Sequence, residues 1–320
     1  MHLHRTSVIC TILCCCCLVL ISCSTSPTPQ ATATPGLTKV IPTPTPTLPP
    51  SPTPSPTTVA PKSYTMRILL QGVGRPDDLA FDPSGRLLFS DFYAGTVSRL
   101  NANGTITMLL RGIAGPEGIV VLTDGTMIIA EQRTNRILAL APQATSPMVL
   151  RQLPGTPSTQ QCKDGVDGIA LDATSKTLII PDSPTGDVYR LSLDGKNLTL
   201  LASGIVRPVG AAVDAQGNVY VADECGGALW RIAPNKTQTR FGQVGMLDDV
   251  VLDTHGNVLV TDLQPSIHAL IRMNLATGLR ETLVSKGLIE PQGLVIGTRD
   301  NIFVSDDYAN LILELCAHTC

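Results

Sequence analysis

The chain has 320 residues, of which 43% are hydrophobic, 15% charged and 3% aromatic. This length suits one large all-β domain or two ordinary domains. The formal net charge is −3, and no acidic residue precedes Asp77. Because there is neither a basic patch nor an aromatic series on which bases could stack, we expect no nucleic-acid partner.

Residues 1–23 predict a signal peptide. A short polar start precedes the apolar stretch Ser7–Leu20, which is shorter than the roughly 20 residues that a membrane-spanning helix needs. The stretch ends in Leu20-Ile21-Ser22-Cys23, which resembles a bacterial lipobox, whose Cys becomes the lipidated first residue. The alternative is an ordinary secretory signal with an incidental Cys. We favour the lipobox, which predicts an extracytoplasmic protein held on the bacterial cell membrane by lipid on Cys23.

Residues 24–61 predict a disordered linker. Of these 38 residues, 12 are Pro and 11 are Thr. Such a composition cannot bury a core and favours extended polyproline II at roughly 3.1 Å per residue. Fully stretched, the linker would hold the following domain on the order of 100 Å from its anchor.

The remaining residues, 62–320, are built on one repeated unit. Its first copy places an apolar run, Leu79–Phe81, and a second one, Leu87–Phe89, around an Asp-Pro-Ser-Gly turn. Six copies occur, and counted from corresponding positions they are 40, 50, 42, 39 and 44 residues apart, at Asp77, Glu117, Asp167, Val209, Asp248 and Gln292. A period of about 40 residues in strand-type units indicates a propeller or a similar array.

Two further strands follow the unit in each copy except the sixth. In the first copy they are Thr96–Leu100 and Ile106–Leu110, joined by the hairpin signal Asn103-Gly104. The sixth copy lacks a fourth strand, whereas a lone strand at residues 65–70 precedes the first copy. We therefore predict an all-β, six-bladed propeller with four strands per blade, closed by strand 65–70 in the last blade.

The repeat also resembles known propellers. Its pattern, clearest in residues 207–223, is similar to the NHL-type repeat and to the six-bladed propellers of the senescence-marker-protein/gluconolactonase superfamily. The resemblance covers about residues 64–320. It implies the propeller fold, but it leaves the chemistry open, because such propellers include lactonases, phosphotriesterases, lyases and pure binding modules.

Acidic residues recur where the innermost strand of each blade begins. In a propeller this strand lines the channel, so these side chains should converge at its mouth. Four of the six are carboxylates: Asp77, Glu117, Asp167 and Asp248. Carboxylates gathered in a small opening repel one another unless a cation lies among them, and oxygen ligands suit Ca²⁺, or less well Mg²⁺.

The resemblance implies metal ligands at the same positions, which here makes Asp77, Glu117, Asp167 and Asp248 the candidates for a Ca²⁺ or other divalent site. Asp78 and Asp249 replace the usual Gly and could supplement them. The ring departs from the pattern, because the catalytic members usually carry Asn at two ring positions and this chain carries none. The alternative is that the carboxylates accept loop N–H groups or face a water-filled channel.

A second acidic ring closes the second strand of every blade. A role repeated in all six blades is architectural, so we expect these carboxylates to accept backbone N–H bonds from loops. The ring consists of Asp91, Glu131, Asp182, Asp223, Asp262 and Asp306.

His268 and four cysteines complete the candidates. His268 follows the second ring on the mouth side and could act as a general base, or it is simply a solvated loop residue. Outside the reducing cytosol the cysteines should pair. The loops that hold Cys162 and Cys225 open on the mouth side of adjacent blades, which predicts a Cys162–Cys225 disulfide that pins the insertion at 153–163. Cys316 and Cys320 would form the second disulfide.

Two functions remain open at this stage. The first is a surface-anchored, divalent-metal-dependent hydrolase of a lactone or similar ester, in which Asp167 or Asp248 activates water. The second is a non-catalytic propeller that binds a carbohydrate, peptide or cell-envelope partner at its mouth. For either function we expect a small-molecule or cell-envelope ligand, a membrane contact through the lipid anchor, and a monomer.

Overall fold

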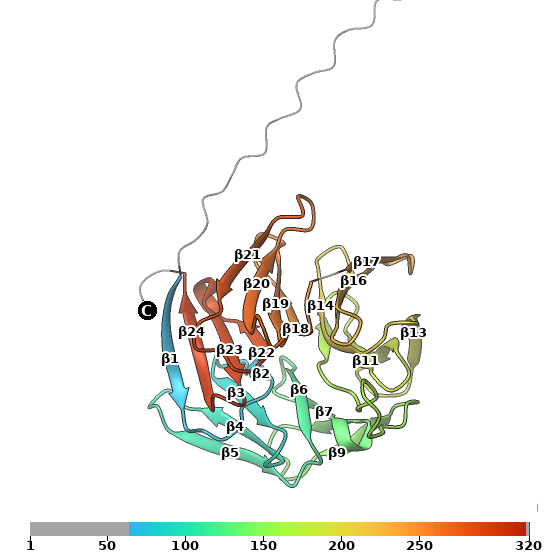
Figure 1. Ribbon diagram of the computed structural model, residues 1–320. Helices are drawn as coiled ribbons and strands as arrows, with labels where there is room; N and C mark the ends of the chain where they lie inside the picture. Colours follow the sequence, from blue (N-terminus) through green and yellow to red (C-terminus); the bar gives the residue numbers. More distant parts are fainter. Residues whose placement is uncertain (1–63, 243, 318–319) are drawn as a thin grey trace, which may run out of the picture. The chain divides into compact units, whose positions relative to one another are not determined.

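The computed structural model describes residues 64–242, 244–317 and 320, and every strand in these residues belongs to one of six four-stranded antiparallel sheets. The sheets stand around a common centre as the blades of a propeller (Figure 1). The predicted six-bladed, all-β fold is therefore confirmed. The only helical segments in the described part are two 3₁₀ turns, Gln132–Thr134 and Thr298–Asp300, and it contains no helix long and apolar enough to cross a membrane.

The strands follow the repeat in chain order. Blade 1 comprises β2 (Leu79–Phe81), β3 (Leu87–Asp91), β4 (Thr96–Leu100) and β5 (Ile106–Arg111). Blade 2 comprises β6 (Pro116–Val121), β7 (Met127–Glu131), β8 (Arg136–Leu140) and β9 (Met148–Gln152). Blade 3 comprises β10 (Ala170–Asp172), β11 (Thr177–Asp182), β12 (Asp187–Ser192) and β13 (Leu198–Ala202).

The second half repeats this order. Blade 4 comprises β14 (Pro208–Val213), β15 (Val219–Asp223), β16 (Ala228–Ile232) and β17 (Gln238–Gly242). Blade 5 comprises β18 (Leu247–Leu252), β19 (Val258–Asp262), β20 (Ala269–Met273) and β21 (Arg280–Val284). Blade 6 comprises β22 (Pro291–Ile296), β23 (Ile302–Asp306), β24 (Leu311–Cys316) and β1 (Thr65–Gln71).

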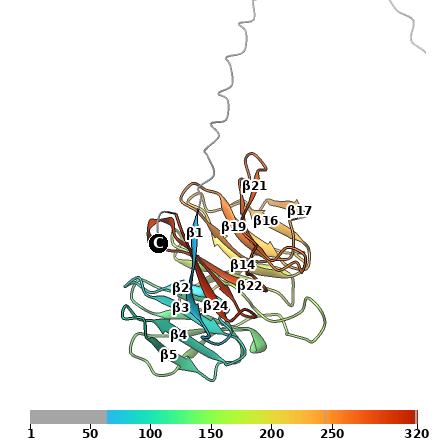
Figure 2. The ribbon, with the colours of Figure 1, turned by 60° about the vertical axis from the view of Figure 1, so that its left-hand side comes forward.

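Strand β1 closes the ring as predicted. It pairs antiparallel with β24, from Thr65 opposite Cys316 to Gln71 opposite Leu311 (Figure 2). The last blade therefore combines strands from both ends of the described chain, and β24 is left without an unpaired edge. The predicted signal peptide, lipobox Cys23 and linker lie outside the described residues.

The core lies between neighbouring blades. Side chains of adjacent sheets form separate apolar clusters, such as Val97, Leu110 and Ile119 between blades 1 and 2. The second strand is buried at every position in five blades, for example β19, and in the third blade only Thr177 of β11 is half-buried. Branched aliphatic residues on both faces of a strand suit this sheet-on-sheet packing.

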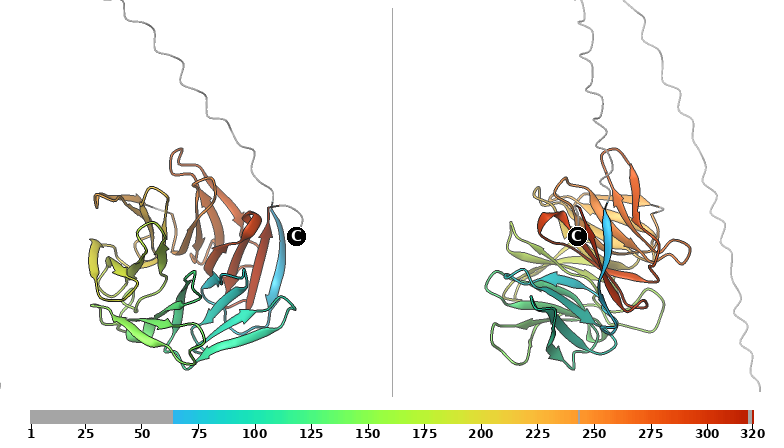
Figure 3. Two further views of the ribbon diagram at one scale, coloured as in Figure 1. Left: turned by 180° about the vertical axis from the view of Figure 1, so that it is seen from behind. Right: turned by 90° about the vertical axis from the view of Figure 1, so that its left-hand side faces the viewer.

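The innermost strands approach one another closely at the centre of the ring (Figure 3). This approach requires glycine in most blades: a Cβ on Gly210 would lie 2.6 Å from the backbone oxygen of Asp248, and one on Gly118 would lie 2.8 Å from that of Asp167. We call the innermost strands the hub, and the rim at which they begin the mouth. Four acidic residues directly precede this position in their blades, at 77, 117, 167 and 248. The position itself is Gly in four blades and Asp in the other two, as Asp78 and Asp249.

Candidate functional site: an acidic hub

Acidic side chains from opposite sides of the ring meet at the hub. Asp77, Asp167 and Asp248 line one central cavity of about 10 Å³, together with Asp78 and Asp249. A cavity of that volume holds about one water molecule or one small ion. The predicted convergence of the inner acidic ring is therefore seen in the structure.

The fourth acid, Glu117, joins the cluster through hydrogen bonds. Burial, followed by the charge of the neighbouring Asp77, raises the pKa of Glu117. The side-chain amide of Gln132 donates to Glu117 and to Asp167, at 3.1 Å each. Gln132 thus bridges acids of two blades and holds them at a fixed separation.

The hub environment disfavours ionised carboxylates. Burial raises the pKa of Asp77 to about 8 and that of Asp78 to about 7. Burial, followed by repulsion from neighbouring carboxylates, holds the pKa values of Glu117 and Asp248 well above their usual range. Burial also raises the pKa of Asp167, although the Arg207 guanidinium opposes this shift.

Asp78 and Asp249, considered as supplementary metal ligands, have a different use. Both oxygens of Asp78 accept backbone N–H bonds, from Leu79 at 2.7 Å and from Ile119 in the next blade at 2.6 Å. Asp249 does the same with Val250 at 2.7 Å and, in blade 6, Leu294 at 2.8 Å. These two acids join consecutive blades, in positions where the other blades carry glycine.

The second acidic ring has the architectural role that the sequence predicted. Asp223 accepts the N–H of Arg207 at 3.0 Å, from the segment that enters its blade, and that of Gly226 at 2.9 Å, from the loop that leaves β15. Asp306 does the same with Ile289 at 2.6 Å and Ala309 at 2.8 Å. Each of these carboxylates therefore ties two mouth loops together.

His268 does not line the hub cavity. It lies in the loop after β19, where its backbone N–H bonds to the carbonyl of Gln264. The cysteines are joined as the sequence suggested, as Cys162–Cys225 and Cys316–Cys320 disulfides.

A further set of residues, not predicted from the sequence, completes the mouth. Each directly follows an acid of the second ring, in the turn that leaves the second strand of its blade. Three of these residues, Gln132, Glu224 and Asp307, contact inner-ring acids or mouth arginines. In the sequence these residues can be found by their position, because each comes directly after a second-ring acid at the end of a strand.

Two arginines enter the mouth, each two residues before an inner-ring position of its blade. Arg75 pairs with Asp307 at 2.7 Å and lies between the rings of Tyr93 and Tyr308, 3.7 and 4.1 Å from their centres. Arg207, from the equivalent position in blade 4, pairs with Asp167 at 3.2 Å. The mouth therefore combines two fixed guanidinium groups with a larger number of carboxyl groups.

The donor set fits a hard divalent cation. Several oxygen donors surround a cavity of single-ion size, and no described cationic side chain forms an ion pair with Asp77, Glu117 or Asp248. As placed, however, the described His, Cys, Asp and Glu side chains contain no group of three close enough to hold a metal. The acids therefore supply suitable chemistry, and binding would require them to draw together.

No protein-family model matches this chain, and no curated protein matches it. Solved structures do. A gluconolactonase from Xanthomonas campestris matches with a TM-score of 0.65 and 16% identity, over 79% of this chain and 89% of the other. The chain shares the six-bladed propeller fold of this structure.

Two other solved structures show the same likeness. Regucalcin from Agrobacterium tumefaciens, a calcium-binding protein, matches with a TM-score of 0.64 and 17% identity over 79% of this chain and 94% of the other. Virginiamycin B lyase from Staphylococcus aureus matches with a TM-score of 0.58 and 17% identity over 74% of this chain and 79% of the other. Identities this low establish a shared fold only, so an activity has to be argued from the residues of the site.

Proposed function

We propose that this protein is a divalent-cation-dependent hydrolase of lactones or related esters, with its site at the hub mouth. The observation that carries the proposal is the convergence of four buried acids from four blades, three of them on one cavity of single-ion size. Paired buried acids without enough counter-charge are costly unless they bind protons or a cation. Regucalcin and gluconolactonase are named among the structural neighbours, which supports this choice.

The role proposed for each acidic residue follows from the groups that surround it. Asp77, Glu117 and Asp248 have no counter-ion among the described residues and would hold Ca²⁺ or a similar ion through their oxygens. When bound, such an ion supplies a Lewis acid that polarises the substrate carbonyl.

Asp167 would accept the proton of the attacking water. Gln132 and Arg207 both donate to one oxygen, Oδ2, which orients the carboxylate and leaves Oδ1 for water. Burial raises the pKa of Asp167, so it is a stronger base than a solvated carboxylate.

A hollow of about 580 Å³ beside Glu224 and Met246 is of the size that small-molecule ligands occupy.

The direct experiment is an activity panel of lactones and phosphoesters, measured with added Ca²⁺, with Mg²⁺ and with chelator. We expect cation-dependent hydrolysis of at least one lactone, abolished by Asp167→Asn and by Asp248→Asn. Folded variants that retain full activity would refute the assignment. A cation-independent activity would refute the role given to the metal.

A second candidate is a non-catalytic propeller that binds a carbohydrate, peptide or cell-envelope partner. The observation in its favour is the pair of half-exposed tyrosines at the mouth, Tyr93 and Tyr308, held on either side of Arg75. Rigid aromatic rings with one open face are common anchors for ligands. Binding without turnover, lost in Tyr93→Ala, would favour this candidate.

We also propose that the protein is a monomer tethered outside the cytoplasm by lipid on Cys23. Strand β1 runs toward the mouth, so the described chain begins at the opposite rim, where Thr65 pairs with Cys316. The mouth therefore lies at the rim away from the point where the described chain begins. Cys23→Ser should move the protein from the detergent phase to the aqueous phase, and an unchanged partition would refute the anchor.

A further inference from the structure

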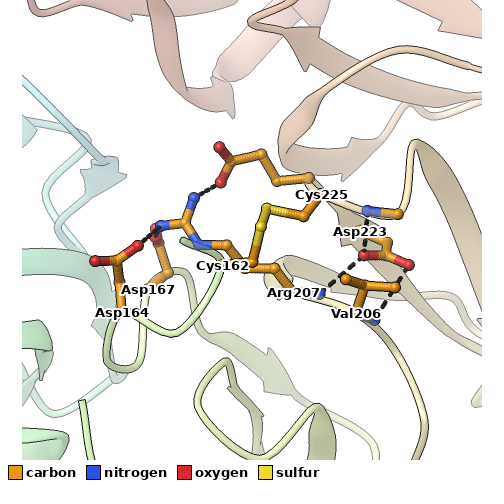
Figure 4. The surroundings of a disulfide bond; sticks show 9 residues. Cys162, Asp164, Asp167, Val206, Arg207, Asp223 and Cys225 are labelled. Carbon is orange, nitrogen blue, oxygen red and sulfur yellow. Dashed lines mark hydrogen bonds and ion pairs between the residues drawn. A yellow bond between two sulfur atoms is a disulfide. The ribbon is translucent and has the colours of Figure 1, made fainter. Parts of the chain in front are cut away.

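Arg207 is held among three carboxylates at the mouth. Its guanidinium lies 3.2 Å from Asp167 and 3.5 Å from Asp164, and it also forms an ion pair with Glu224. Figure 4 shows the side chain extended toward Asp164 and Asp167. Only 12% of the side chain is exposed, so this charge is largely shielded from solvent at the mouth.

The Cys162–Cys225 disulfide holds two of these partners in place. Asp164 lies two residues after Cys162, and Glu224 directly precedes Cys225. The disulfide thus joins the insertion before β10 to the loop after β15, and Arg207 lies between the two acids that these segments carry (Figure 4).

The backbone of Arg207 is fixed as well. Its N–H bonds to Asp223 at 3.0 Å, and its carbonyl accepts the N–H of Glu224 at 3.1 Å. Both ends of the residue are therefore tied to the loop that carries Cys225. Movement of that loop would move the guanidinium relative to Asp167.

A fixed guanidinium on Asp167 and a divalent cation held by the neighbouring acids would be two positive charges at the same small hub. An arginine side chain is a permanent cation in proteins, and this one forms an ion pair with Asp167. A cation at the hub would be repelled by the guanidinium and would find Asp167 Oδ2 already engaged. Removal of the guanidinium should therefore strengthen cation binding, although an ion pair is lost.

We infer that Arg207 is a resident cation that weakens divalent-ion binding at the hub, and that the Cys162–Cys225 disulfide sets this affinity by holding Arg207 against Asp167. The inference rests on the proposed cation site. It assigns to the disulfide a role in binding in addition to its structural role.

The test is a calorimetric titration of Ca²⁺ into the chelator-treated protein. Arg207→Gln should bind Ca²⁺ at least about tenfold more tightly than the wild type, because an opposite charge at this distance shifts a carboxylate equilibrium by about one to three powers of ten. Arg207→Lys retains the charge and is the matched control, with an affinity close to the wild type. The Cys162→Ser, Cys225→Ser double variant should also bind more tightly, by a smaller factor.

Combining the substitutions separates a shared mechanism from independent effects. With Gln at position 207, loss of the disulfide should add no further affinity, because there is no guanidinium left to hold. Wild-type binding with an unchanged or weaker affinity in Arg207→Gln would overturn the inference and leave the proposed site intact. If Arg207→Gln fails to fold by circular dichroism, an unchanged affinity in the double serine variant overturns it. Absence of binding in every folded variant would refute the proposed cation site and this inference with it.

Discussion

Individual hub carboxyl groups determine how this protein responds to pH. An acid whose folded pKa lies above its unfolded value favours the folded state at low pH, and this contribution is lost as the pH rises through the folded pKa. Asp77, whose pKa burial raises to about 8 from an ordinary value near 3.8, is the clearest case. Its neighbours Glu117 and Asp248 shift in the same direction.

Without divalent cations, the free energy of unfolding should therefore fall between about pH 4 and pH 8. Each proton contributes at most about 1.4 kcal/mol per pH unit. Asp77→Asn keeps the shape, removes one titrating group and should flatten this slope. Urea unfolding at several pH values with chelator measures it. Wild-type stability that rises toward pH 8 would contradict the environment described for Asp77.

Acids of the two rings should respond in opposite ways to neutralisation. Asp223 is fully buried and accepts several backbone N–H groups, so Asp223→Ala leaves buried donors without partners and should cost about 3 kcal/mol. Asp248→Asn replaces a buried acid whose pKa burial raises well above its usual range and which forms no ion pair with a described residue, so it should leave the metal-free protein as stable or more stable. Urea denaturation at pH 7 compares them. Equal losses would refute the distinction between the rings.

At the scale of single elements, strand β1 is the piece that closes the ring. It pairs with β24 over its whole length and covers an edge that would otherwise be open to other chains. A chain that begins at Gly72 should lose cooperative unfolding or aggregate. A chain that begins at Tyr64 retains β1 and should unfold in one transition. Equal thermal unfolding of the two chains would show that closure does not stabilise the fold.

The elements were more predictable than the contacts between them. The repeat fixed six blades and the closing strand, because strand alternation and turn residues recur at each copy. The second ring was also readable, since an acid at the end of every β-hairpin points to a shared loop role. Arg207 was not recognised as part of the site, because its partners Asp164 and Glu224 are 43 and 17 residues away in sequence and meet only in the folded ring.

Asp78 and Asp249 show a second limit of the sequence. From sequence they are extra carboxylates at the hub, equivalent to the other ring acids. In the structure their oxygens are taken by backbone N–H groups of the same strand and of the next blade. Which carboxylates keep free oxygens depends on the close approach of neighbouring inner strands, and that approach is a property of the closed ring.

At the scale of the whole molecule, the ring gathers one acid from each of four blades into a volume that no single blade could enclose. This convergence places Asp77, Asp167 and Asp248 around one cavity, although they are up to 171 residues apart in sequence. Closure supplies the rigidity, and the mouth loops supply the charges. The proposed function therefore depends on whether this acidic centre binds a cation.

Calorimetric titration of Ca²⁺ into the metal-free wild type, with Asp248→Asn as the control, tests this most directly. We predict saturable binding of one ion per chain that is lost or strongly weakened in the variant. At 100 times its dissociation constant the ion should stabilise the fold by about 2.7 kcal/mol. No saturable heat with Ca²⁺ or Mg²⁺ up to millimolar concentrations, or equal binding by Asp248→Asn, would contradict the account.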